Sequence, residues 1–254
     1  MARLDEALRK ARSINTGIVC PKVFSIESMR RNIVSAHELQ QPIILQIDSK
    51  YIDIEDVLFW KDEYAKNYPC ADIYVMVEGI KNFEEAVKVG TYAIDGIALS
   101  DCLKDEKTIK NIYDVMQYAS ISLERSVSSA EIMAGKIENA DIIRINDLTI
   151  NDENISSIIA SVKELTKDKR AVYAVNDFEV SKENFKKVKN LGISKFNVYE
   201  TASKQATKKL DEIMHADYDH NDRFFMIYLV QNMLEGYCST VKQRMYYLGQ
   251  FILR

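Results

Sequence analysis

Histidine, glycine and proline are scarce in this sequence of 254 residues, which holds three, eight and three of them. The histidines, His37, His215 and His220, all stand outside the short apolar runs that predict strands. Catalytic zinc is usually bound by two or three imidazoles, so these positions exclude a histidine-rich zinc site at the strand ends. Serine residues near the strand ends also lack a histidine to activate them, which leaves a Ser–His triad unsupported.

The shortage of glycine bears on phosphate binding. A phosphate cradle needs close approach of the backbone, which glycine allows. Only Gly79 directly follows a predicted strand end, so we do not expect a glycine-built phosphate site. Proline occurs only at positions 21, 42 and 69, and no Gly/Ser-rich linker is present, which argues against an internal domain boundary.

Long apolar runs and basic runs are also missing. No stretch approaches 18 apolar residues, so we expect no membrane span. The formal net charge is −4, which argues against a nucleic-acid partner. The N-terminal segment has the spacing of an amphipathic helix and lacks the apolar region of a signal peptide. The four cysteines form no CxxC pair and are typical of free thiols in a reducing compartment, so we expect a cytoplasmic protein.

Eight short apolar runs are present instead, and amphipathic helical patterns separate them. The runs cover residues 17–24, 42–48, 71–79, 95–101, 120–126, 140–147, 171–177 and 195–201, and the helical patterns cover 26–39, 54–68, 83–89, 108–118 and 155–165. Strands and helices in this alternation predict a parallel sheet. Eight units in about 250 residues match an α/β fold of the (β/α)8 TIM-barrel type. An open doubly wound sheet is the rival, but its Gly-rich first turn is missing.

The C-terminal part is longer than an eighth barrel helix requires. We expect one domain over residues 1–254, with an extended helical region from about 203 to 254. Aromatic and methionine residues recur at helical spacing between Phe225 and Leu248. Such a stripe is typical of core or subunit contact.

Chemistry in a barrel lies where its strands end. Seven of the eight runs carry a carboxylate at or near their end, and cations lie nearby, which gives the candidates Lys22, Asp48, Glu78, Asp101, Glu124, Arg144, Asp147, Asp177 and Glu200. The carboxylates could hold a hard cation such as Mg²⁺, or they could cap the following helices. We favour capping, because it needs no ligand and recurs in every unit. Glu124 and Arg144 could equally form an internal ion pair.

Three segments carry a resemblance to a known family. They are KKVKNLGISKFNVYETASKQATKKL (186–210), NFEEAVKVG (82–90) and VKQRMYYLGQ (241–250). In their order along the chain, from about Leu4 to Gly249, they resemble the class II (metal-dependent) ketose-bisphosphate aldolases, which include the fructose-bisphosphate aldolases. The resemblance implies a (β/α)8 barrel that is usually oligomeric.

The resemblance also places the family's working residues on this sequence. The acid/base position falls on Val77, and positions of metal ligands fall on Glu78, Glu124 and Val175. The phosphate-binding glycines are replaced by residues that include Asn176 and Asp177, while the asparagine of the eighth strand is retained as Asn197. The resemblance therefore implies that the zinc site, the proton carrier and the phosphate anchor are all lost.

Three functional hypotheses follow. Aldol cleavage in this family needs a Lewis acid and a carboxylate base, so the first is a catalytically inactive homologue with a structural, assembly or regulatory role. It would form a homo-oligomer or bind a protein partner, and it would hold neither zinc nor another cofactor. The second is an active aldehyde-lyase acting on a sugar phosphate, with Mg²⁺ or Mn²⁺ held by carboxylates such as Glu78 and Glu124. The third is a barrel that binds a small non-phosphorylated or cationic ligand in an acidic mouth.

Overall fold

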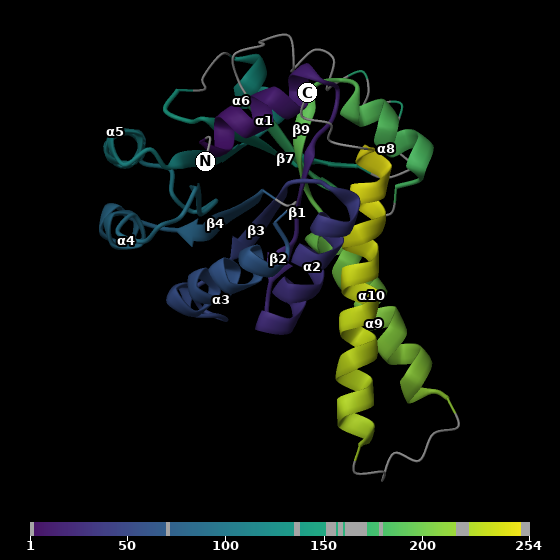
Figure 1. The fold of residues 1–254 in the computed structure, drawn as a ribbon. Coiled ribbons are helices and arrows are strands. Elements are labelled where there is room, and N and C mark those ends of the chain that lie inside the picture. The colour runs from purple at the N-terminus through teal and green to yellow at the C-terminus, as the bar shows by residue number, and fades with distance from the viewer. Residues whose placement is uncertain are drawn as a thin grey trace.

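A computed structural model describes residues 3–69, 72–134, 138–150, 172–177, 180–216 and 224–249, together with Ser156 and Ala160. Its centre is a closed barrel of parallel strands (Figure 1). The strands are β1 (Ile18–Cys20), β2 (Lys22–Val23), β3 (Ile43–Ile47), β4 (Ile73–Ile80), β5 (Gly96–Leu99), β6 (Ser122–Val127), β7 (Ile142–Ile150), β8 (Val172–Asp177) and β9 (Ile193–Asn197). Both β1 and β2 pair with β3, on either side of Pro21, and β1 also pairs with β9, which closes the ring. The predicted (β/α)8 TIM barrel is confirmed.

Helices surround the barrel. They are α1 (Leu4–Ser13), α2 (Ile26–Leu39), α3 (Ile54–Asn67), α4 (Phe83–Val89), α5 (Glu106–Tyr118), α6 (Ser129–Met133), α8 (Lys182–Lys189), α9 (Tyr199–Met214) and α10 (Phe225–Leu248). The predicted helices at 26–39 and 83–89 match α2 and α4 in full. The helix predicted over 155–165 falls largely outside the described residues.

The N-terminal helix closes one end of the barrel. Leu4, Leu8 and Ala11 of α1 are fully buried and pack with residues near the beginnings of the strands, among them Ile18 and Ile44. Gly96 begins β5 at this end, and a Cβ there would come within 3.0 Å of a Leu4 methyl group. The apolar plug leaves the opposite end of the barrel, where the strands finish, to polar side chains.

Alternation along the strands decides which residues face the helices. Val77 and Val175 are completely buried in the apolar cluster between the barrel wall and the helices. Successive side chains of a strand point to opposite faces, so the neighbouring Glu78 and Asn176 belong to the inner face. The position expected for the acid/base residue, Val77, is therefore not an inner-face position.

In the helices that the structure describes, side-chain caps come from residues other than the strand-end carboxylates. The N-cap side chains that accept a backbone hydrogen bond are those of Ser25, Asp53, Asn82, Asp105, Ser128 and Ser181. The favoured interpretation, in which strand-end carboxylates cap the helices, was wrong. Asp147 comes nearest to it, since its carboxylate accepts from the backbone amide of Ser129 in α6 at 3.0 Å. Glu200 is part of the first turn of α9.

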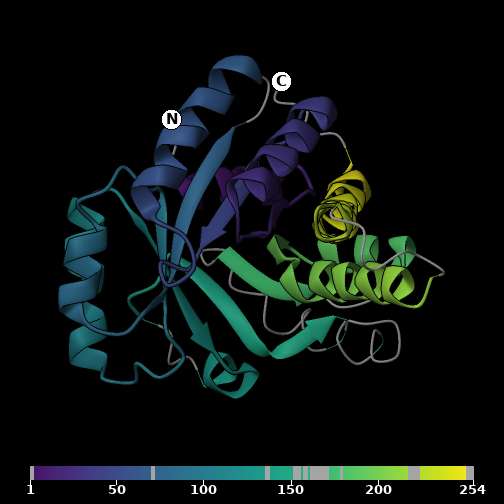
Figure 2. The same ribbon diagram turned by 90° about the horizontal axis from the view of Figure 1, so that it is seen from below.

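The C-terminal helix α10 lies between α2 and α9 on the outside of the barrel (Figure 2). Its contact with α9 is close, because a Cβ on Gly236 would lie 2.9 Å from the carbonyl oxygen of Gln205. The hydroxyl of Tyr237 donates to the carbonyl oxygen of Lys22 at 2.9 Å, which connects α10 to β2. No helix in the described part of the chain combines the length and hydrophobicity that a membrane crossing requires.

Candidate functional site

Two lysine–carboxylate pairs occupy the inside of the barrel beyond the apolar plug. Glu78 of β4 is bound by the ammonium of Lys22 from β2, and it also accepts from the side-chain amide of Gln46 in β3. Across the barrel, Lys195 of β9 lies 2.7 Å from a carboxylate oxygen of Glu124 in β6. Each pair joins different strands, so the barrel wall fixes the position of both charges.

The Lys195–Glu124 pair is shut off from solvent, with side-chain exposures of 0% and 1%. Burial alone would lower the pKa of Lys195, but nearby groups that include Glu124 raise it above its ordinary value. Its ammonium also donates to the side-chain oxygen of Asn197 at 2.7 Å. A lysine held as a cation has no free electron pair, so Lys195 is not prepared to form a Schiff base.

Cys20 is connected to Glu78 of the first pair through the side chain of Gln46. Its thiol donates to Gln46 Oε1 at 3.1 Å, and Gln46 in turn donates to Glu78. Burial raises the pKa of the Cys20 thiol to about 12. A neutral buried thiol is a poor nucleophile and metal ligand, so Cys20 has a structural part in this network. Lys22, at the outer end, lies 4.6 Å from the centre of the Tyr199 ring.

A second cluster of polar side chains lies near Glu124 at the mouth of the barrel, the end where the strands finish. Arg144 donates to Asp101 at 2.7 Å, and its Nε atom lies 3.8 Å from Glu124. An ion pair between Glu124 and Arg144, one of the two alternatives that the sequence left open, is therefore present, although Lys195 is the closer partner. Asn197 donates to Asn176 Oδ1 at 3.2 Å and links β9 to β8.

Asp177 lies apart from this group. Its carboxylate is fully buried against Arg244 of α10 and accepts from that guanidinium. Burial raises the pKa of Asp177 to about 6, although Arg244 opposes the shift. Asp177 was predicted as a mouth residue, but it instead connects the barrel wall to the C-terminal helix. Arg244 also donates to the carbonyl oxygen of Val180 at 3.1 Å.

Two inner-face residues escaped the sequence analysis, namely Lys195 and Gln46. Gln46 lies inside the predicted run 42–48, which contains β3, and Lys195 is the first residue of the predicted run 195–201, which overlaps β9. A lysine between Ile193 and Phe196 in a short apolar run is the signal that could have identified Lys195, since a lysine is almost never buried unless it is paired.

The arrangement does not fit the zinc that the fold family implies. Within the described residues, no group of three or more His, Cys, Asp or Glu side chains could hold a metal ion. Glu78 and Glu124, at the expected ligand positions, already bind Lys22 and Lys195. A metal ion there would have to approach a lysine ammonium, and the imidazoles that zinc prefers are missing from the strand ends.

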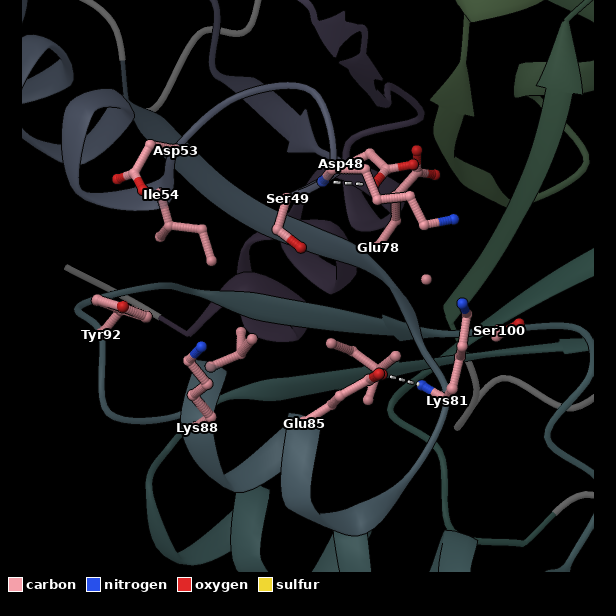
Figure 3. Close-up of a pocket in the computed structure, with 14 residues that line it drawn as sticks. Asp48, Ser49, Asp53, Ile54, Glu78, Lys81, Glu85, Lys88, Tyr92 and Ser100 are labelled. Atoms are coloured by element: carbon pink, nitrogen blue, oxygen red, sulfur yellow. Dashed lines mark hydrogen bonds between the residues drawn. The ribbon is translucent and has the colours of Figure 1, made fainter.

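A cavity of about 390 Å³ lies beside the mouth, at the ends of β3 and β4 (Figure 3). The loop after β3, the end of β4 and one side of α4 form its walls. Its lining residues are Asp48, Ser49, Lys50, Asp53, Ile54, Glu78, Gly79, Ile80, Lys81, Glu85, Lys88, Val89, Tyr92 and Ser100. Glu78 thus belongs both to the inner network and to the wall of this cavity.

Comparison with known proteins identifies the fold. No family model matches the sequence, and no curated protein matches it. The crystal structure of the YdjI aldolase from Escherichia coli K12 matches with a TM-score of 0.74 and 14% sequence identity, over 98% of this chain and 97% of that chain. The protein has an aldolase-type barrel fold.

Two further solved structures agree. A candidate fructose-1,6-biphosphate aldolase from Coccidioides immitis matches with a TM-score of 0.67 and 16% identity, over 97% of this chain and 94% of the other. The fructose-bisphosphate aldolase of Campylobacter jejuni matches with a TM-score of 0.63 and 12% identity, over 96% and 93%. The resemblance to the class II aldolases is thus confirmed at the level of the fold, over nearly the whole aldolase-type barrel.

Proposed function

We propose that this aldolase-type barrel is a catalytically inactive homologue, with a structural, assembly or regulatory role and no bound metal. The observation that carries the proposal is the pairing of Glu78 with Lys22 and of Glu124 with Lys195. Aldol cleavage in the metal-dependent class needs a cation that polarises the ketone and stabilises the enediolate. The lysine ammoniums neutralise their own carboxylates, and Lys195 is fully buried.

A cleavage assay tests the proposal. Purified protein is incubated with fructose 1,6-bisphosphate and, in separate reactions, with Zn²⁺, Mg²⁺ or Mn²⁺, and the release of triose phosphate is measured. We expect no release above that of heat-denatured protein. Turnover that requires Mg²⁺ or Mn²⁺ and is abolished in Glu78→Gln would instead support an active lyase with a carboxylate-bound metal.

The assembly role involves the C-terminal helices. The far ends of α9 and α10 extend beyond the barrel as a helical pair (Figure 1). Met214 of α9 and Met226, Ile227 and Val230 of α10 are between 43% and 65% exposed there. A second copy of the chain would cover this surface with the same residues, as a twofold dimer does.

Localisation in the cytoplasm agrees with the free thiols of Cys20, Cys102 and Cys238.

Light scattering after size-exclusion chromatography tests this assembly. We expect the wild type to run as an oligomer and Ile227→Glu to shift toward the monomer, because a charge buried in an apolar interface is costly. Val115→Glu, at an exposed position of α5, is the matched control and should leave the mass unchanged. A monomeric wild type would contradict an assembly through these helices.

A binding role for a small ligand is the second candidate, and the cavity beside the mouth favours it. The cationic ligand expected for an acidic mouth has less support. Glu78, Glu124 and Asp101 already pair with lysine or arginine side chains of the barrel. Their negative charge is therefore compensated within the protein.

A further inference from the structure

A second cavity lies among the helices that surround the barrel, between α9, α10 and the segment that precedes α8 (Figure 1). Its volume of about 480 Å³ is within the usual range of small-molecule sites. Among the described residues that line it, every side chain except that of Val180 carries a hydrogen-bonding group, and none carries a carboxylate. The walls are therefore polar without being acidic.

Arg244 is the only charged side chain among these described lining residues, and its charge already has a partner. Its Nε atom donates to the buried carboxylate of Asp177, and its Nη1 atom donates to the carbonyl oxygen of Val180 at 3.1 Å. A cation that is paired inside the protein leaves little net charge to attract an ion. The cavity therefore does not select a ligand by its charge.

Hydrogen-bonding groups without a partner are what the cavity offers instead. In the described part of the chain, the side-chain amides of Gln205 and Gln243 and the Nη2 atom of Arg244 have no hydrogen-bond partner. Each amide can both donate and accept, and Nη2 donates. Arg244 is only 3% exposed and lines the cavity, so the cavity is the open side on which Nη2 can meet an acceptor.

The α10 side of the cavity adds acceptors and an aromatic ring. The hydroxyls of Ser239 and Thr240 both donate to the carbonyl oxygen of Gly236, at 3.2 and 2.9 Å, so their own oxygens are left to accept from a ligand. The half-buried ring of Tyr247 packs edge-on against Phe185 and forms part of the wall. An aromatic ring beside hydrogen-bonding groups suits a molecule with both C–H and O–H surface.

We propose that this cavity binds a neutral polyhydroxylated molecule of the size of a monosaccharide or a sugar alcohol. Each hydroxyl of such a molecule donates and accepts, which matches the amides of Gln205 and Gln243, the donor of Arg244 and the acceptors on α10. The described lining residues include no member of the lysine–carboxylate pairs inside the barrel. The proposal therefore holds whether or not the barrel has lost its aldolase activity.

Saturation-transfer NMR titrations of the full-length protein test the proposal with glucose, sorbitol, gluconate and cyclohexanol. We expect saturable binding of glucose or sorbitol with a Kd below about 10 mM. Gluconate adds a carboxylate and should bind no more tightly than sorbitol, because Arg244 is already paired. Cyclohexanol keeps a ring with a single hydroxyl and should bind more weakly than glucose. Added salt should change the affinity for the neutral ligands by less than about twofold, since screening acts on charges.

Amide-deleted variants locate the site. The double variant Gln205→Ala/Gln243→Ala should bind the polyol about fivefold more weakly or worse, because each lost hydrogen bond contributes roughly 0.5–1.5 kcal/mol. Gln231→Ala removes an exposed amide from α10 that does not line the cavity, and it should bind as the wild type does. Circular dichroism checks that both variants are folded.

Four results would overturn the proposal. They are failure of both glucose and sorbitol to bind, equal or tighter binding of cyclohexanol, salt-sensitive binding in which gluconate is preferred to sorbitol, and wild-type affinity in the double variant. The third result would show that the site selects an anion, and the last would place the ligand elsewhere on the protein.

Discussion

The ammonium group of Lys195 lies 2.7 Å from a carboxylate oxygen of Glu124 in the interior of the barrel, and both side chains are closed to solvent. The pair joins β9 to β6 and satisfies the charge of Glu124 without a metal ion. Removing two ions from water is expensive, and their attraction repays the cost only when the geometry is good and further hydrogen bonds form. Asn197 supplies such a bond to the ammonium. Arg144 Nε lies 3.8 Å from the other carboxylate oxygen of Glu124, so that carboxylate has a cation near each of its oxygens.

Breaking this pair should destabilise the fold. Lys195→Met leaves the carboxylate of Glu124 buried without its closest partner, and we expect a loss of about 3–5 kcal/mol in the free energy of unfolding. The double variant Lys195→Met/Glu124→Leu removes both charges and should recover most of that loss. Urea denaturation followed by circular dichroism measures both effects.

The exposed pair between Lys110 and Asp114 on α5 provides the control for this measurement. Lys110→Met should cost no more than about 1 kcal/mol, because solvent screens a surface pair. If Lys195→Met lost no more free energy of unfolding than Lys110→Met, the buried pair would not stabilise the fold.

The pH dependence of stability should report on Asp177. Burial raises the pKa of its carboxyl to about 6 in the folded protein, from an ordinary value of 3.8. The folded state therefore holds this proton more tightly, so the contribution of Asp177 favours folding below about pH 4 and is lost as the pH rises through 6. Relative to Asp177→Asn, the wild type should lose at most about 3 kcal/mol over this range.

Urea denaturation at pH values between 4 and 7 tests this dependence. Asp114→Asn, a change at an exposed carboxylate, should follow the wild-type profile. A wild type that gained stability over Asp177→Asn as the pH rose would contradict this prediction. It would show that the pairing with Arg244 outweighs burial and lowers the pKa of Asp177.

The contact of α9 with α10 should depend on Gly236. A Cβ at this position would lie 2.9 Å from the carbonyl oxygen of Gln205 and 2.9 Å from Lys209 Cγ. Gly236→Ala gains up to about 1 kcal/mol of helix propensity, but overpacking against backbone costs roughly 1–3 kcal/mol. We expect a net loss of stability in thermal or urea denaturation.

Gln231→Ala, at an exposed position of the same helix, is the control for Gly236→Ala. It should change the free energy of unfolding by no more than about 0.5 kcal/mol. A stabilised Gly236→Ala protein would mean that the two helices are not in close contact at this point.

The sequence was sufficient to predict the barrel because its strands and helices alternate with clear boundaries. It could not show the orientation of Val77 and Val175, since the strands of a parallel sheet are buried on both faces and give no alternating pattern. The caps were missed for another reason. Ser25 and Asp53 lie beyond the strand ends, at the points where the helices begin, so the strand-end carboxylates were the wrong candidates.

The site was predicted less completely than the fold. Glu78 and Glu124 were identified as strand-end carboxylates, but their partners Lys22 and Lys195 come from strands distant in sequence. Only the closure of the barrel brings them together.

The most direct test of the central claim is a titration of the untagged, chelator-treated protein with Zn²⁺ in a calorimeter. The lysine pairs at Glu78 and Glu124 predict no one-to-one site with a Kd below about 10 μM. Glu78→Gln and Glu124→Gln should give the same result as the wild type. A tight one-to-one site that either variant abolished would contradict the claim that lysines stand where the aldolase-type barrel would need a metal.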